Sequence, residues 1–289
     1  MNNLNIRTAI ITGGTSGIGF YSAMGIEKAG FKVIITGRNI ERGKAAEKSI
    51  IHETKNRNIK FIVGDISSIR KIDMLTKSIL EQTNEIDVLI NNAGYFGDTY
   101  QKTEDGLEKH FAINVLGPYR LTHNLLPLLK VAKKARVINV TGGDKPASID
   151  PDNLQAEKGF RGLMTFKHSK SVLESVSMVL AEELKSYNIS VNIVFPGRAS
   201  TATTKSLTLK SLPGLMKIMF PLMKLFFRED NGKSALKAAK STIWAATSTE
   251  LNNVSGKYFD ANCKKQSVHK TARNSQIQSH IIQTIKSSF

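Results

Sequence analysis

The sequence predicts an α/β fold, a doubly wound parallel sheet of about seven strands with helices on both faces. Three observations lead to this fold class. Apolar runs rich in β-branched residues alternate with helical patterns up to residue 198. A glycine-rich turn follows the first run. Chemically distinctive residues stand where the runs end, at the sheet edge where such folds bind ligands: Gly13, Asp65, Asn92, Thr141 and Pro196.

The first half of the chain contains three strand–helix pairs. The run TAIITGG is apolar and ends in glycines, which predicts a buried strand that stops in a turn. The next segment, FYSAMGIEKAG, has helical spacing and a glycine stop. This alternation repeats twice. Predicted strands lie at residues 8–14, 31–39 and 59–67, and predicted helices at 20–30, 41–58 and 69–82.

The second half continues the pattern with longer helices. IDVLINNAG, ARVINVTGG and ISVNIVFPG are apolar runs that end in polar or turn-forming residues. They predict strands at 86–94, 135–143 and 189–197, with long helices at 107–132 and 164–185 between them. Strands that alternate with helices imply right-handed crossovers, and therefore a parallel sheet covered on both faces.

Composition agrees with one globular domain over residues 1–289. Hydrophobic residues make up 40% of the 289-residue chain, enough for a full core. The one cysteine, Cys263, excludes an internal disulfide framework and a multi-cysteine zinc site. The N-terminal residues run straight into the first strand, so we expect no secretory signal. These features indicate a cytoplasmic protein without a metal.

One apolar stretch, LPGLMKIMFPLMKLFF at 212–227, breaks the alternation. It is too short to span a bilayer and contains two lysines and two prolines. We interpret residues 198–230 as an inserted apolar flap over a pocket for an apolar small molecule. A helix packed on the core and peripheral membrane contact remain as alternatives.

The net charge of +17 favours polyanions or anionic membrane surfaces as partners. The lysines are spread along the chain, however, and no basic–aromatic interleaving or DNA-reading motif is present. We therefore expect a solvated basic surface and no nucleic-acid partner.

The turn TGGTSGIG at residues 12–19 predicts a dinucleotide site. Gly13 permits a tight turn, while Gly17 and Gly19 let the backbone approach a pyrophosphate and let the helix approach the strand. The following helix directs its N-terminus at the phosphates. A strand before the glycines and a helix after them strengthen this interpretation.

With these motifs the sequence resembles the short-chain dehydrogenase/reductase superfamily over nearly its whole length. TGGTSGIG matches the family's TGxxxGxG, and NNAG (91–94), NVLG (114–117) and PG (196–197) match three further family motifs. The retinol-dehydrogenase-like branch looks nearest, from GRN after the second strand, DNLQAEKGF (152–160) and SGKYFDANCKK (255–265). The resemblance implies a Rossmann-type oxidoreductase that binds a nicotinamide cofactor and forms a homodimer or homotetramer.

The end of the second strand favours NADP(H) over NAD(H). An NAD enzyme would carry a carboxylate there for the ribose hydroxyls. This chain has Gly37, then Arg38, which can pair with a 2′-phosphate. By resemblance, Asp65 and Ile66 would contact the adenine and Lys170 the nicotinamide ribose. The expected cofactor-binding residues are Gly13, Thr15, Ser16, Gly17, Ile18, Gly19, Arg38, Asn39, Asp65, Ile66, Asn92, Ala93, Gly94, Lys170, Pro196, Gly197 and Thr201.

The family's reaction centre combines Asn, Ser, Tyr and Lys, with Tyr and Lys spaced Y-x-x-x-K on one helical face. In the family, the phenol donates a proton to the carbonyl oxygen, and the serine gives that oxygen a second hydrogen bond. Asn114 and Lys170 match, but Phe166 stands at the tyrosine position and Gly142 at the serine position. Because a positioned general acid contributes roughly 10²–10⁴ in rate, ordinary ketone–alcohol redox should be badly impaired.

Four residues are candidates to replace the missing groups. Thr141 lies one residue before the serine position, where strand neighbours point to opposite faces, so it would need a local shift. Tyr95 directly follows NNAG, and Arg198 follows the PG turn. Lys170, without a phenol partner, could itself donate a proton.

Two other residues of the segment TFKHSK are expected to be bystanders. His168 lies about 200° away on the helix and should face solvent or a neighbouring element, and Ser169 has no predicted role. Three functions stay open. We favour an NADP(H)-dependent oxidoreductase with altered chemistry over a non-redox cyclase or isomerase and over a non-catalytic NADP(H)-binding pseudoenzyme.

Overall fold

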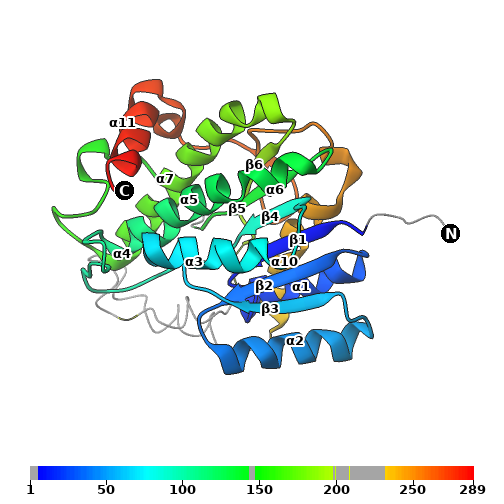
Figure 1. Ribbon diagram of the computed structural model, residues 1–289. Helices are drawn as coiled ribbons and strands as arrows, with labels where there is room; N and C mark the ends of the chain where they lie inside the picture. Colours follow the sequence, from blue (N-terminus) through cyan, green and yellow to red (C-terminus); the bar gives the residue numbers. More distant parts are fainter. Residues whose placement is uncertain (1–5, 143–146, 198, 200–207, 209–231) are drawn as a thin grey trace.

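The computed structural model describes residues 6–142, 147–197, 199, 208 and 232–289. An eight-stranded sheet lies between two layers of helices (Figure 1), and this confirms the predicted fold class. The strands are β1 Thr8–Thr12, β2 Lys32–Gly37, β3 Ile59–Val63, β4 Val88–Asn91, β5 Arg136–Val140, β6 Ser190–Val194, β7 Tyr258–Phe259 and β8 Lys265–Gln266.

The strand order is β3-β2-β1-β4-β5-β6-β7-β8. The chain builds outward from β1 to β3 and then returns to the other side of β1 with β4. This reversal is a topological switch point, where the segments that follow β1 and β4 run to opposite faces of the sheet and a ligand can enter. All neighbouring strands are parallel except β7 and β8.

Alternate residues of each strand supply two separate cores. Ile10 packs into the core under one helical layer, and its neighbours Ala9 and Ile11 pack into the core under the other. One layer contains α1 Gly17–Lys28, α2 Ile40–Thr54 and α10 Lys233–Thr247. The other contains α3 Ile69–Leu80, α5 Gly117–Asn124 and α7 Gly162–Glu183, with α11 Ser275–Lys286 packed on α7.

The predicted long helix at 107–132 is confirmed for most of its length, because residues 109–131 are helical apart from the turn residue Leu125, although they fall into four elements. These are α4 Lys109–Phe111, the π-helical turn η1 Ala112–Leu116, α5, and α6 Leu126–Val131. Pro118 and Pro127 lie in the first turns of α5 and α6, where a missing backbone N–H costs little. The π-helical turn contains Asn114, and such turns are frequent at functional sites.

The end of the sheet also differs from the expected parallel arrangement. β7 and β8 contain two residues each and pair antiparallel, which is too short for a sequence pattern to predict. Short 3₁₀ segments complete the described part: η2 Pro151–Asn153, η3 Lys185–Tyr187, η6 Thr249–Leu251 and η7 Lys270–Arg273.

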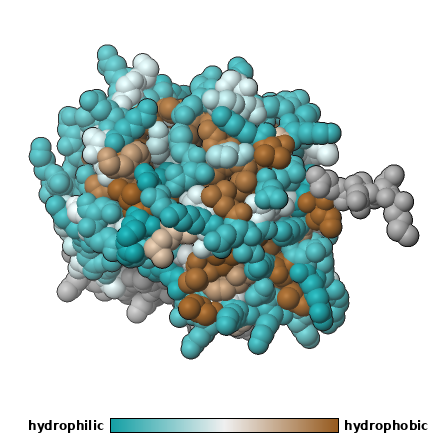
Figure 2. All heavy atoms as spheres, viewed as in Figure 1, coloured by the Kyte–Doolittle hydropathy of each residue, from teal (hydrophilic) through white to brown (hydrophobic). Residues whose placement is uncertain are grey.

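The predicted flap at 198–230 lies almost entirely outside the described residues, as do Arg198 and Thr201. Within the described helices, none is long and apolar enough to cross a membrane. Figure 2 shows one face of the molecule, on which hydrophilic side chains prevail and apolar side chains gather only in separate groups.

Candidate active site

The glycine turn after β1 has the backbone that a dinucleotide site requires. Gly13 and Gly17 adopt φ of +67° and +55°, values that favour glycine. A Cβ on Gly19 would lie 2.4 Å from the Gly13 carbonyl oxygen. Ser16, at the N-cap of α1, makes no side-chain cap hydrogen bond. The first-turn N–H groups of α1 are thus not capped by this side chain, and they suit a phosphate.

The motif after β4 holds this turn in place. Asn92 Nδ2 donates to the carbonyl oxygens of Thr12 at 2.8 Å and Gly13 at 3.3 Å. The backbone N–H groups of Asn92 and Ala93 both donate to Thr12 Oγ1 at 3.0 Å. These bonds join the ends of β1 and β4 across the switch point, so Asn92 fixes the shape of the cradle.

The residues after β2 fit a 2′-phosphate. Arg38 is exposed and, within the described ranges, forms no ion pair. Asn39 instead caps α2, accepting a hydrogen bond from the Arg42 N–H at 2.7 Å. A Cβ on Gly37 would approach Thr15 Cγ2 to 2.6 Å. A side chain at position 37 would therefore have to displace the side chain of Thr15.

The other predicted cofactor residues lie around the same edge. Asp65 accepts hydrogen bonds from Ser67 N at 3.0 Å and Ser67 Oγ at 2.9 Å, which shapes the loop after β3. Gly94 lies over the reaction centre, because a Cβ there would be 3.3 Å from Lys170 Nζ. The remaining predicted residues are partly or fully buried near strand ends: Ile18, Ile66, Pro196 and Gly197.

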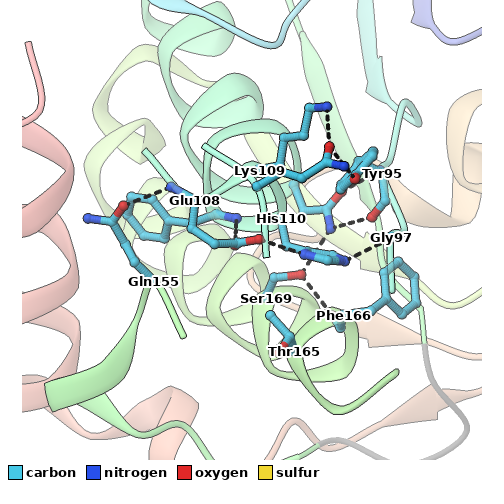
Figure 3. Close-up of polar contacts among 12 residues, drawn as sticks. Tyr95, Gly97, Glu108, Lys109, His110, Gln155, Thr165, Phe166 and Ser169 are labelled. Carbon is cyan, nitrogen blue, oxygen red and sulfur yellow. Dashed lines mark hydrogen bonds and ion pairs between the residues drawn. The ribbon is translucent and has the colours of Figure 1, made fainter. Parts of the chain in front are cut away.

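Lys170 and Asn114 meet at the carboxyl edge of β4 and β5. Lys170 is buried and its Nζ donates to the Val140 carbonyl at 3.1 Å. Asn114 Oδ1 accepts from Tyr95 N at 2.8 Å, and its Nδ2 donates to Tyr95 O at 3.0 Å and Ser169 Oγ at 2.9 Å. Ser169, for which the sequence predicted no role, thus anchors the asparagine to α7 (Figure 3 shows Tyr95 and Ser169).

Phe166 and Gly142 lie against each other. A Cβ on Gly142 would be 3.0 Å from Phe166 Cζ and 3.2 Å from Cε1. The Lys170 Nζ is 6.0 Å from the centroid of the Phe166 ring. The two positions that resemble the family's serine and tyrosine positions therefore face one another, and neither carries a hydroxyl.

Thr141 is turned toward α7. It is buried, and its hydroxyl donates to Glu174 Oε1 at 2.7 Å. Burial raises the pKa of Glu174 to about 7 and lowers the pKa of Lys170 to about 8. Glu174 was not among the predicted site residues, although an acid four residues after Lys170 on the same helical face is a usable signal.

Tyr95 and His168 do not bring their polar atoms to Lys170. The Tyr95 phenol lies 3.5 Å from Gln101 Oε1, and burial raises its pKa. His168 Nε2 accepts from the Asp150 N–H at 3.0 Å, in line with its expected neighbouring-element contact. Tyr95 contributes to the centre through its backbone.

A buried network supports the loop that contains Tyr95 (Figure 3). Glu108 and His110 are fully enclosed, with 2.8 Å between Glu108 Oε1 and His110 Nδ1. The Gly97 N–H donates to His110 Nε2 at 3.1 Å. Since Nε2 accepts, the ring proton lies on Nδ1, where it is donated to the carboxylate. Gln155 Oε1 in turn accepts from Glu108 N at 3.0 Å.

Aromatic rings continue from Phe166 along this network. Phe96 packs edge-on to Phe166 with ring centroids 5.7 Å apart. His110 lies 6.2 Å from Phe96 and 5.7 Å from Phe160, and Tyr100 lies 5.8 Å from Phe160. The side of the centre next to Phe166 is consequently apolar.

The fold is a doubly wound α/β sheet that brings a glycine-rich turn, Asn114 and the buried Lys170 to one edge. Residues 7–211 match the short chain dehydrogenase family. The chain is 31% identical over 269 residues to retinol dehydrogenase 12 of Mus musculus, covering 93% of this chain and 81% of that protein. It is also 31% identical to human retinol dehydrogenase 14 over 274 residues, with coverages of 90% and 79%. The chain therefore belongs to the short-chain dehydrogenase family.

Solved structures share the fold. A protein of Mycobacterium paratuberculosis, described as putative and uncharacterised, matches with a TM-score of 0.74 and 20% identity, covering 98% of this chain and 92% of its own. RhlG of Pseudomonas aeruginosa, solved as an NADP active-site complex, matches with a TM-score of 0.65 and 25% identity, with coverages of 89% and 95%.

Proposed function

We propose that this protein is an NADP(H)-dependent oxidoreductase that acts on an apolar small molecule by chemistry without the tyrosine–serine pair. One observation carries the proposal. The glycine cradle around Gly19 and the buried Lys170 are both present, but the Phe166 ring lies against the backbone of Gly142, so neither of these two positions carries a hydroxyl. The RhlG complex with NADP supports the cofactor, and the retinol dehydrogenase relatives support an apolar substrate.

The chain's own residues would hold the cofactor at three points. The N–H groups at the start of α1 would bind the pyrophosphate. Arg38 would pair with the 2′-phosphate through its planar guanidinium. Lys170 would bind the nicotinamide ribose. When bound, the nicotinamide supplies or accepts a hydride.

Phe166 restricts the substrates that can react. A ketone needs a proton donor at its oxygen, and no hydroxyl is present at positions 166 and 142. An iminium ion already carries the positive charge, and a conjugated acceptor develops its charge elsewhere. Both can accept a hydride without a phenol, and the aromatic rings near Phe166 suit an apolar substrate body.

The proposal is tested by binding and turnover measured separately. NADPH should bind at micromolar concentrations and more tightly than NADH. Iminium ions and enones should consume NADPH with a matching reduced product, whereas ketones should react slowly. Failure of NADPH to bind, or no turnover on any of these three classes, would overturn the proposal.

A double variant gives a sharper result. Phe166→Tyr with Gly142→Ser restores the two hydroxyls, and we expect ketone reduction to rise by roughly 10²–10⁴. Phe166→Leu with Gly142→Ala is the matched control, since it changes the same positions without a hydroxyl. Equal ketone reduction by both double variants would contradict the assigned positions.

A non-redox function is the second candidate, and the buried acid and base Glu174 and Lys170 favour it. Two groups that titrate near neutral pH suit proton transfer in an isomerisation or a cyclisation. Its signature is conversion of an apolar substrate without net oxidation of the cofactor. A strict one-to-one relation between product and oxidised NADPH would exclude it.

A further inference from the structure

We propose that Glu174 is a positioning residue whose carboxylate keeps the Lys170 ammonium charged beside the cofactor site. The inference rests on the proposed function, because it concerns the lysine expected to bind the nicotinamide ribose. Position 166 carries no phenol, and the glutamate would be the anionic partner of the lysine.

The two residues lie on one helix, and their hydrogen-bond partners lie at the end of one strand. Glu174 lies one turn after Lys170, on the same face of α7. Their exposed fractions are 2% and 4%. Lys170 Nζ donates a hydrogen bond to the Val140 carbonyl oxygen. Glu174 Oε1 accepts a hydrogen bond from the hydroxyl of Thr141, the residue after Val140. Both charged groups are therefore fixed by two consecutive residues at the end of β5.

Half of the Glu174 carboxylate is left without a direct bond. Its Oε2 is buried and has no hydrogen-bond partner. Within the described ranges, no ion pair of 4.0 Å or less joins it to a cation. If accepting the hydrogen bond from Thr141 were the only task of this side chain, the neutral amide of a glutamine could perform it equally well. The second carboxylate oxygen is thus available for an electrostatic role.

Electrostatics support the pairing in both directions. Burial lowers the pKa of Lys170 to about 8, and the charge of Glu174 opposes that shift. Burial raises the pKa of Glu174 to about 7, while the Thr141 bond and the charge of Lys170 oppose it. Between these values the helix carries a negative and a positive charge one turn apart. Because both groups are buried, each charge compensates the other.

Among the residues that the structure describes, few other titratable groups face this pair. The Tyr258 phenol approaches from β7, and burial first, then the charge of Glu174, raises its pKa. Asp260 adds a smaller effect on Tyr258. From η1 comes the Asn114 amide, and from β5 the Thr141 hydroxyl, neither of which titrates. Of the described groups that face one another here, Lys170 and Glu174 are the two whose pKa values lie at about 8 and about 7.

The direct test is the titration of Lys170 in the protein without cofactor. Lysine side chains are labelled with ¹³C at Cε and followed by NMR, with Lys170→Met identifying the signal. In Glu174→Gln, which keeps an acceptor for Thr141, we expect the midpoint to fall by about one pH unit or more. An unchanged midpoint would overturn the inference. Glu182→Gln, at an exposed site on the same helix, is the control and should leave the Lys170 midpoint unchanged.

A second variant keeps the test decisive if Glu174→Gln does not fold. Thr141→Val removes the bond that helps Glu174 ionise, so Glu174 stays neutral over a wider pH range. The Lys170 midpoint should again move down, by less than in Glu174→Gln. A midpoint that moves up or stays fixed would contradict the role of the carboxylate.

NADPH titration separates this inference from the proposed function. If Glu174 keeps Lys170 charged, Glu174→Gln should weaken NADPH about tenfold more at pH 8 than at pH 6.5. The same loss at both values would contradict the inference. If NADPH binds the unaltered protein at neither pH, the proposed function fails, and the NMR titration still decides the role of Glu174.

Discussion

Two side-chain contacts determine the chemistry available at the scale of single residues. The Phe166 ring lies against the backbone of Gly142, which leaves an incoming oxygen without a hydroxyl partner. The Thr141 hydroxyl donates to Glu174, so this hydroxyl points into the protein interior. For Thr141 to replace the missing serine hydroxyl, this bond would have to break and the strand would have to shift locally. Among the described residues, Lys170 and Glu174 are two buried groups beside this position that can carry a charge.

Glu174 should give the stability of the protein a specific pH dependence. Its folded pKa of about 7 is above the ordinary value of 4.5, so the folded state holds the proton more tightly. The stabilisation is full below pH 4.5 and is lost as the pH rises through 7. Urea unfolding should show a fall on the order of 1–3 kcal/mol across this window. Glu174→Gln should lack the fall, and Glu182→Gln should retain it.

Lys170 acts in the opposite direction at higher pH. Its folded pKa of about 8 lies below 10.5, so the unfolded state binds the proton more tightly. Stability should therefore rise between these values, and Lys170→Met should abolish that rise. A single unfolding series from pH 4 to 11 can resolve both windows.

At the scale of elements, the site is a junction of three segments. The π-helical turn η1 places Asn114 between the loop after β4 and helix α7. Its amide makes three hydrogen bonds, two to the backbone of Tyr95 and one to Ser169. The buried pair of Glu108 and His110 holds the same loop at Gly97. The loop is thereby fixed at two points before any ligand binds.

Removal of the Asn114 amide should loosen this junction. Asn114→Ala leaves the Tyr95 N–H and carbonyl unpaired, and we expect a loss of about 2–4 kcal/mol in the free energy of unfolding. Ser169→Ala removes one of the three bonds and should cost about 1 kcal/mol. Urea unfolding of the two variants provides the comparison. Equal losses would show that the bonds to Tyr95 contribute nothing.

At the scale of the whole molecule, the predicted cofactor would contact both halves of the sheet. The glycine turn follows β1, Arg38 follows β2, and Lys170 lies beside β5. A ligand held at all three places stabilises the folded state as a unit. The chain's basic character, with a net charge of +17, suits the phosphates of such a ligand.

NADPH should therefore raise the stability of the complete protein. At a concentration one hundred times its Kd, the expected gain in the free energy of unfolding is about 2.7 kcal/mol. NADH at the same concentration should give a smaller gain, and Arg38→Ala should reduce the difference between the two. Denaturation with each nucleotide is the measurement. Equal stabilisation by NADH and NADPH would contradict the role of Arg38.

Much of the fold was predictable because its signals are local. Apolar runs and glycine stops fix each strand within a few residues, as in the predicted 8–14 against the observed Thr8–Thr12. The strand–glycine–helix order around Gly13 and Gly17 has one favourable backbone, which the positive φ values confirm. The helix at 107–132 was predicted less well, since helical spacing does not reveal a π-helical turn.

The sequence by itself determined the doubly wound sheet, the glycine turn and the absence of a tyrosine four residues before Lys170, because each depends only on neighbours along the chain. The tertiary structure decided the rest. Glu174 becomes a partner of the lysine only because β5 buries it beside Thr141, and His110 supports the site only because Gly97 folds back onto it. Such roles depend on burial and on contacts between distant segments, which periodicity along a chain does not encode.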